Sequence, residues 1–124
     1  MRDILVVAAG GGIGAALRHL AGLVALRTLG PSFPYGTMIV NVVGSLLMGL
    51  VIEWFVRRGG GTQLRLLLAT GLLGGFTTFS SFSLDAVALW QRGEGVLATG
   101  YVVGSVALGL AGLVAGLAIG RAVF

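Results

Sequence analysis

The sequence has no cysteine, no lysine and a single histidine, and it has only four acidic residues. Without cysteine, disulfides, zinc–thiolate sites and thiol catalysis are excluded. The acids Asp3, Glu53, Asp85 and Glu94 are scattered, so no spacing assembles a nucleophile, a base and an orienting group. There is no phosphate-binding loop. The chain is therefore expected to be neither an enzyme nor an ATP-driven transporter.

Charge of either sign is also scarce. Charged residues make up 10% of the 124 positions, against about 25% in an ordinary soluble domain. Hydrophobic residues make up 56%, and the mean hydropathy is +1.04. A soluble fold of this size could not bury so much apolar surface, because small domains bury the smallest fraction of their surface. The chain is therefore expected to lie in the lipid bilayer of the cell membrane.

All eight basic residues are arginines, and the net charge is +4. Most of these arginines lie at the edges of apolar stretches, which is typical of membrane proteins. A nucleic-acid-binding protein would instead gather its basic residues on one face. Nucleic acid is therefore not expected as a partner.

Four apolar stretches follow one another, at about 4–26, 35–56, 64–90 and 96–122. Each exceeds the roughly 20 residues that a helix needs to cross the hydrocarbon core. The connections are short and contain turn residues such as Gly30-Pro31. We expect an all-α integral membrane protein, with residues 1–124 forming one domain of four transmembrane helices.

Glycine is unusually abundant, with 23 residues. Small residues four positions apart let helix backbones approach closely in lipid, where no hydrophobic force drives helices together. Four slim helices have little interior, so we expect the chain to oligomerise. The spaced glycines are Gly10 and Gly14, Gly71 and Gly75, Gly100 and Gly104, and Gly112, Gly116 and Gly120.

The third stretch is expected to break near its middle. Gly74-Gly75 is followed by Thr77-Thr78, and both pairs weaken a helix. As one helix the stretch would be about 40 Å long, more than the roughly 30 Å core requires. A break frees backbone groups, which lipid tolerates only where they line a cavity or bind an ion.

The same stretch carries a cluster of hydroxyl and aromatic side chains. Phe79 and Phe82 are three residues apart and share a helix face, and the positive edges of their rings can receive a small anion. In the alternative interpretation the rings only pack, and the hydroxyls bond carbonyls one turn earlier. The hydroxyls belong to Thr77, Thr78, Ser80, Ser81 and Ser83.

Two polar side chains fall inside apolar stretches. Asn41 either faces a water-filled path or ties helices together. Arg18 is costly in lipid unless it snorkels to the interface or faces an aqueous vestibule.

Together these elements resemble the Fluc (CrcB-type) fluoride channels. The matching segments are 11–18 (GGIGAALR), 34–37 (PYGT), 41–45 (NVVGS) and 74–83 (GGFTTFSSFS). The resemblance covers the whole chain in order and length. It implies an antiparallel, dual-topology dimer that lets fluoride leave the cytoplasm passively, with a second subunit that is either identical or a paired homologous chain.

The resemblance also implies roles for particular residues. A structural Na⁺ at the dimer centre would be held by the backbone carbonyls of Gly74 and Thr77, and Arg18 would lie at a vestibule. Where the family commonly has threonine and glutamate, this chain has Ser81 and Asp85, and the shorter acid leaves its role open. The implied fluoride pathway comprises Asn41, Thr78, Phe79, Ser80, Ser81, Phe82, Tyr101 and Ser105.

Two other functions remain to be weighed. A small dual-topology multidrug exporter coupled to protons needs an acid within the membrane, and Asp85 is the only one deep enough. A non-transporting structural subunit would explain the glycines but not the cluster of hydroxyls and phenylalanines.

Overall fold

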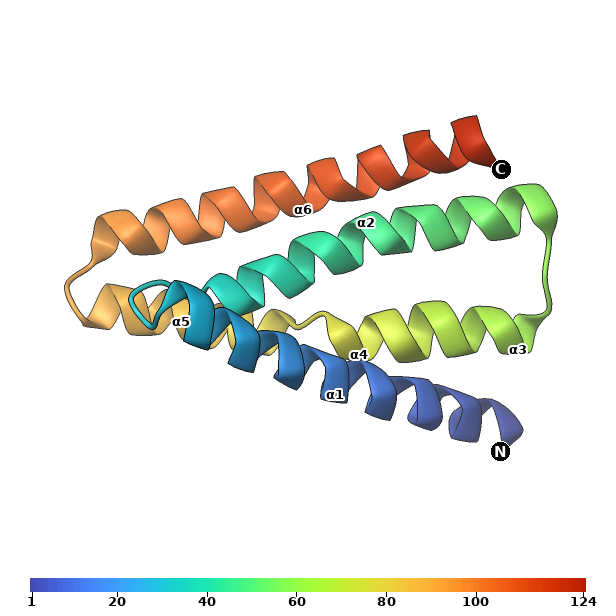
Figure 1. Ribbon diagram of the computed structural model, residues 1–124, viewed down its shortest axis with the longest axis horizontal. Helices are drawn as coiled ribbons and strands as arrows, with labels where there is room; N and C mark the ends of the chain where they lie inside the picture. Colours follow the sequence, from blue (N-terminus) through green and yellow to red (C-terminus); the bar gives the residue numbers. More distant parts are fainter.

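The computed structural model describes all 124 residues, and almost the whole chain is helical (Figure 1). Short connections separate the helices, and glycines in the left-handed region follow the first two long ones, Gly30 at φ 85° and Gly59 at φ 73°. The elements are α1 (Arg2–Leu29), α2 (Tyr35–Arg58), α3 (Thr62–Arg65), η1 (Leu66–Leu73), α4 (Gly74–Phe76), α5 (Phe79–Gln91) and α6 (Gly95–Val123).

Four helical segments are long and apolar enough to cross a membrane. Three are the continuous helices α1, α2 and α6, and the third in chain order runs from Thr62 to Gln91 through α3, η1, α4 and α5. Each extends by up to three residues beyond the apolar stretch expected from the sequence. The expected all-α membrane architecture with four spans is confirmed, and the chain is a multi-pass membrane protein.

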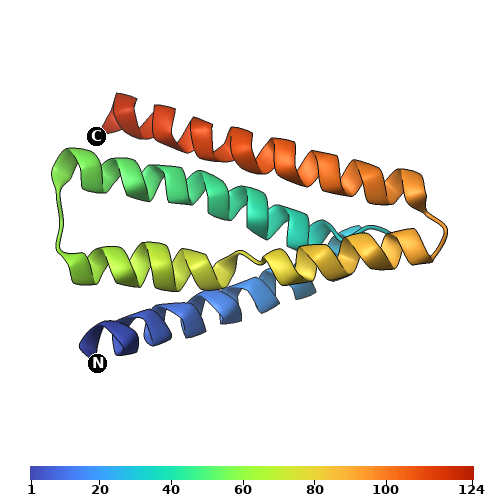
Figure 2. The same ribbon diagram turned by 180° about the vertical axis from the view of Figure 1, so that it is seen from behind.

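The two halves of the third span have different neighbours. Its first half, η1 and α4, packs along α1, whereas its second half, α5, packs against α6 (Figures 1 and 2). Helix α2 lies along α6 for most of its length. Both termini and the α2–α3 connection lie at one end of the molecule, and the other two connections lie at the opposite end.

The third span breaks at Thr77 and Thr78, as the sequence predicted. Both residues are extended, with φ −87° and ψ 158° at Thr77 and φ −152° and ψ 122° at Thr78. Gly74 and Gly75 still belong to the last helical turn before the break. The π-helical turns of η1 were not expected, and they lie where α1 approaches the span most closely.

Glycines permit this close approach. A Cβ atom on Gly10 would lie 2.6 Å from the Leu67 carbonyl oxygen, and one on Gly14 would overlap the Leu72 carbonyl oxygen. Gly116 on α6 is packed just as tightly against the α2 backbone. The packing role predicted for these glycines is therefore confirmed. Gly100 and Gly104 differ, because no backbone atom lies within 4 Å of a Cβ placed there.

An ion-paired cluster ties α2 to α6 near the ends of both helices. Glu53 is only 6% exposed. Its Oε1 atom lies 3.0 Å from the Arg57 Nε atom, and its Oε2 atom lies 3.5 Å from the Arg121 Nε atom. Burial of a carboxylate is costly unless it is paired. The two arginines therefore account for an acid at this position.

Replacing Gly14 by alanine is expected to lower the free energy of unfolding by about 1–3 kcal/mol, because the added methyl group must push two backbones apart. The matched control is Gly12→Ala on the same helix, where a Cβ meets nothing within 4 Å. Thermal unfolding of both variants in detergent measures the difference. Equal melting temperatures for the two variants would contradict the packing role.

Candidate ion site at the break in the third span

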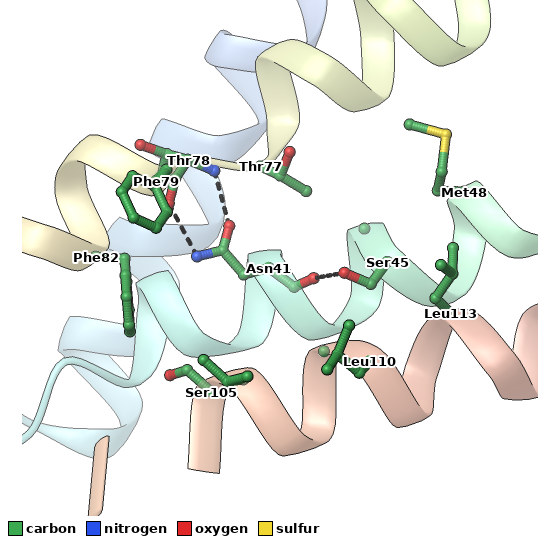
Figure 3. Close-up of a pocket in the computed structure, with 13 residues that line it drawn as sticks. Asn41, Ser45, Met48, Thr77, Thr78, Phe79, Phe82, Ser105, Leu110 and Leu113 are labelled. Carbon is green, nitrogen blue, oxygen red and sulfur yellow. Dashed lines mark hydrogen bonds between the residues drawn. The ribbon is translucent and has the colours of Figure 1, made fainter. Parts of the chain in front are cut away.

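A groove of about 410 Å³ opens beside the break, between α2, α5 and α6 (Figure 3). One wall is the break itself with the two phenylalanines that follow it, and the others come from α2 and α6. In the middle of the membrane spans the groove is lined by polar side chains, two aromatic rings and the aliphatic side chains of Met48, Val106, Leu110 and Leu113. Its lining includes Asn41, Ser45, Thr77, Thr78, Phe79, Phe82 and Ser105.

Asn41 holds the break open from α2. Its Nδ2 atom donates to the Thr78 carbonyl at 3.0 Å, and its Oδ1 atom accepts the Thr78 amide at 2.7 Å (Figure 3). The side-chain oxygen thus replaces the backbone partner that the Thr78 amide loses at the break, and the side-chain nitrogen adds a second partner to the Thr78 carbonyl, which as N-cap also accepts the first bond of α5. The interpretation of Asn41 as a tie between helices is therefore correct for this chain. Its second N–H remains for the groove, so its role in a pore stays a prediction.

Thr78 caps the helix that starts after the break. Its hydroxyl accepts the amide of Ser81 at 3.2 Å, which is the usual arrangement for a threonine before a helix. The N-terminus of α5 carries a partial positive charge. Because Thr78 and Phe79 line the groove, this positive helix end lies beside it.

The break also takes the helical donors from the four carbonyls of residues 74–77. The Gly75 carbonyl accepts Arg18. In a continuous helix, the amides of Thr78 and Ser81 would bond the carbonyls of Gly74 and Thr77. Here those amides bond Asn41 Oδ1 and Thr78 Oγ1 instead. The chain has no cluster of acidic or histidine side chains that could hold a metal. Backbone carbonyl oxygens are ligands that suit hard cations.

Arg18 reaches the break from α1. Its Nε atom donates to the Gly75 carbonyl at 3.1 Å. It also lines a second pocket of about 260 Å³ together with Thr78 and Ser81. Arg18 thus contacts the opposite side of the same break, where its positive charge is close to two hydroxyl groups. The predicted vestibule remains untested.

The two phenylalanines lie on one face of α5. The Phe79 and Phe82 ring centroids are 5.7 Å apart, with the ring planes inclined by 47°. Phe82 packs into the protein, whereas Phe79 is 79% exposed in the middle of a membrane span. The edge of the groove is thus aromatic and faces outward from the chain.

The hydroxyls of the third span fall into two groups. Thr77 and Ser83 bond the carbonyls of Leu73 and Phe79, four residues earlier, at 3.0 Å each. The alternative interpretation from the sequence is therefore correct for these two. The others surround the break: Thr78 caps α5, Ser80 Oγ lies 3.4 Å from Thr78 Oγ1, and Ser81 lines the pocket of Arg18.

The two residues predicted on α6 have different surroundings. Ser105 lines the groove and is 9% exposed, and its hydroxyl has no hydrogen-bond partner. Buried polar atoms without a partner are rare, and Ser105 Oγ is one that the fold of this chain leaves unsatisfied. Tyr101 does not line the groove. It lies behind Phe82, and its hydroxyl donates to Asp85 at 3.1 Å.

The structure adds two residues of α2 to the predicted set. Ser45 lines the groove and donates to the Asn41 carbonyl at 2.7 Å. It lies four residues after Asn41, so helical spacing could have placed it on the same face. Gly44 also lines the groove, and a Cβ there would overlap the Thr77 side chain. Gly44 thus lets α2 approach the break.

Comparisons with known proteins agree on one family. Residues 5–117 match the family model described as "CrcB-like protein, Camphor Resistance (CrcB)". The chain is similar to proteins named "Fluoride-specific ion channel FluC" from several bacteria. It is 51% identical to the one from Mesorhizobium japonicum and 57% identical to the one from Methylobacterium nodulans, covering 98% of both chains in each case. It is 56% identical to the one from Rhodopseudomonas palustris, over 96% of this chain and 97% of that protein. The chain therefore belongs to the CrcB family.

Proposed function

We propose that this chain is the subunit of a fluoride-selective channel that lets fluoride leave the cytoplasm passively across the plasma membrane. The groove at the break carries the proposal, because it places polar side chains and aromatic rings between three of the four membrane spans. The names of the relatives support fluoride as the ion.

A fluoride path must replace the water that the ion loses. Fluoride is small, and moving a compact ion into a medium of low dielectric constant costs tens of kcal/mol by a Born estimate. The free N–H of Asn41, the unpartnered hydroxyl of Ser105 and the N-terminus of α5 offer partial positive charge around the groove. The ring edges of Phe79 and Phe82 add to it. Arg18, on the other side of the break, raises the local concentration of anions.

A second subunit would complete the path. Gly74, Phe79 and Ser80 are exposed at the break, although they lie in the middle of a membrane span. Polar backbone and hydroxyl groups facing hydrocarbon are costly, so another protein surface is expected to cover them. We propose an antiparallel dimer whose two breaks face each other, formed with an identical chain or a paired homologous one.

A structural Na⁺ fits the same place. The carbonyls of Gly74 and Thr77 have lost their helical donors, and Gly74 is exposed toward the proposed partner. A bound Na⁺ would supply positive charge that satisfies these carbonyls. The Asn41 and Thr78 side chains hold the two halves of the third span through hydrogen bonds to the Thr78 backbone and the Ser81 amide, which leaves the Gly74 and Thr77 carbonyls for a cation.

Neither alternative function gains support from the contacts. A proton-coupled exporter needs an acid free to exchange protons with its substrate. Asp85 instead accepts the Tyr101 hydroxyl, and Glu53 is paired with two arginines at the end of its span. A purely structural subunit would not need an open groove with an unpartnered serine.

Liposomes containing only this purified chain are expected to release fluoride rapidly and to retain chloride. A fluoride electrode and a chloride electrode measure the two rates. Chloride release at a similar rate would contradict selectivity. If neither ion is released, co-expression with a related chain tests whether the channel needs two different subunits. No fluoride release from that pair would overturn the proposal.

Leucine substitutions identify the groove as the path. Phe79→Leu and Phe82→Leu remove the ring edges and are expected to abolish most fluoride release, whereas Phe55→Leu, near the end of α2, should keep it. Equal rates in all three variants would place the path elsewhere.

A cysteine at position 74 is expected to link two copies of the chain. The protein has no cysteine of its own, so Gly74→Cys introduces a single thiol at the break. A residue near a two-fold axis meets its own copy, so mild oxidation should give a covalent dimer on a denaturing gel. The control is Val96→Cys, exposed at one end of α6, whose copies lie at opposite membrane surfaces in an antiparallel dimer. Cross-linking at position 96 alone would contradict this arrangement.

Sodium is expected to raise the melting temperature of the dimer. A cation that binds only the folded state at 100 times its Kd adds about 2.7 kcal/mol of stability. Thermal unfolding is compared in matched buffers of Na⁺, K⁺ and an organic cation. The same melting temperature in all three buffers would count against a bound Na⁺.

A further inference from the structure

Asp85 is the acid in the second half of the third span, and it makes no ion pair. Its Oδ2 atom accepts a hydrogen bond from the Tyr101 hydroxyl at 3.1 Å. This hydrogen bond joins α5 to α6. An acid in a membrane span is costly and is normally retained for a purpose.

Tyr101 connects that hydrogen bond to the aromatic rings of the groove. It is fully buried, with 0% of its surface exposed. Its ring centroid lies 5.3 Å from that of Phe82 at an angle of 41°. On another side Phe33 meets the Tyr101 ring edge-on, with centroids 5.5 Å apart and planes at 88°. The rings of Phe79, Phe82, Tyr101 and Phe33 therefore form a continuous row from the break to the α1–α2 connection.

The hydrogen bond fixes one end of this row. Asp85 and Phe82 are three residues apart, so they lie on the same side of α5. The Tyr101 ring packs on Phe82 while its hydroxyl is held by Asp85. Thr37 contacts the same Tyr101 hydroxyl from α2, so Asp85 is one of two side chains that hold it. Tyr101 does not line the groove.

We propose that Asp85 is a positioning residue for the ion path: it fixes Tyr101, and the Tyr101 ring in turn fixes the Phe82 ring at the groove. The proposal rests on the proposed function, because the position of Phe82 affects conduction only if ions pass the groove. Asp85 acts through Tyr101 and does not itself contact the ion.

A double-mutant cycle tests this coupling. Tyr101→Phe keeps the ring and removes the hydroxyl, and Asp85→Ala removes the acceptor. Each single variant is expected to slow fluoride release about two- to tenfold, the effect of one lost hydrogen bond. The double variant should be no slower than the slower single variant, because both changes break the same interaction. Losses that multiply in the double variant would overturn the proposal.

A conservative variant of Asp85 distinguishes its role in positioning Tyr101 from an effect of its negative charge. Asp85→Asn keeps an oxygen that accepts the Tyr101 hydroxyl, so it should restore most of the rate that Asp85→Ala loses. A rate as low as that of Asp85→Ala would mean that the carboxylate charge itself acts, and the proposal would be wrong. Tyr35→Phe is the matched control, because it removes the other tyrosine hydroxyl from a ring 4.9 Å from Phe33. It should keep the wild-type rate.

A second measurement does not depend on conduction. With 4-fluorophenylalanine at position 82, the fluorine resonance should be narrow in the otherwise unmodified protein and in Asp85→Asn. It should be broad or split in Asp85→Ala, because the ring is no longer held in one position. An unchanged resonance in Asp85→Ala would overturn the proposal. If the unmodified channel itself fails to conduct, the proposed function is wrong, whereas conduction with no coupling between Asp85 and Tyr101 rejects this inference alone.

Discussion

The two hydrogen bonds between Asn41 and Thr78 are the constraint on which the rest of the site depends. A membrane span that stops being helical must find partners for its backbone groups, because lipid offers none. Asn41 supplies an acceptor for the Thr78 amide and a donor for the Thr78 carbonyl, so the third span can change direction without leaving that amide unpaired. Once Thr78 is held, its hydroxyl can cap α5, and the positive end of α5 is fixed beside the groove.

Close helix packing makes that tie possible. Asn41 reaches Thr78 only because α2 approaches the break, and Gly44 permits the approach by leaving room for the Thr77 side chain. On the other side, Gly14 brings α1 against the backbone near the break, which puts Arg18 within 3.1 Å of the Gly75 carbonyl. Glycine therefore serves the site as well as the fold. It lets side chains from two neighbouring helices act as backbone partners for a third.

Much of this could be predicted from the sequence, because the signals were local. Long apolar stretches gave the four spans, and Gly74-Gly75 followed by Thr77-Thr78 gave the break. The contacts between distant residues could not be predicted in the same way. The bond from Tyr101 to Asp85 and the lack of a partner for Ser105 depend on how α6 packs against α5 and α2, which no local pattern encodes. The π-helical turns of η1 likewise lie where another helix packs against the span, outside the reach of local propensity.

The break brings the negative carbonyl end of one helical segment and the positive amide end of the next to the same depth in the membrane. The helical segment before it ends in carbonyls that have lost their donors, and the helix after it begins with a positive end. The first suits a cation and the second an anion, and a single chain leaves both partly open to its surroundings. In the proposed dimer, a cation at the carbonyls would lie between the two breaks, whereas an anion at the start of α5 would lie next to Phe79 and the groove. The two ions would bind at different positions, because the carbonyl oxygens lie at the end of α4 and the amide N–H groups lie at the start of α5.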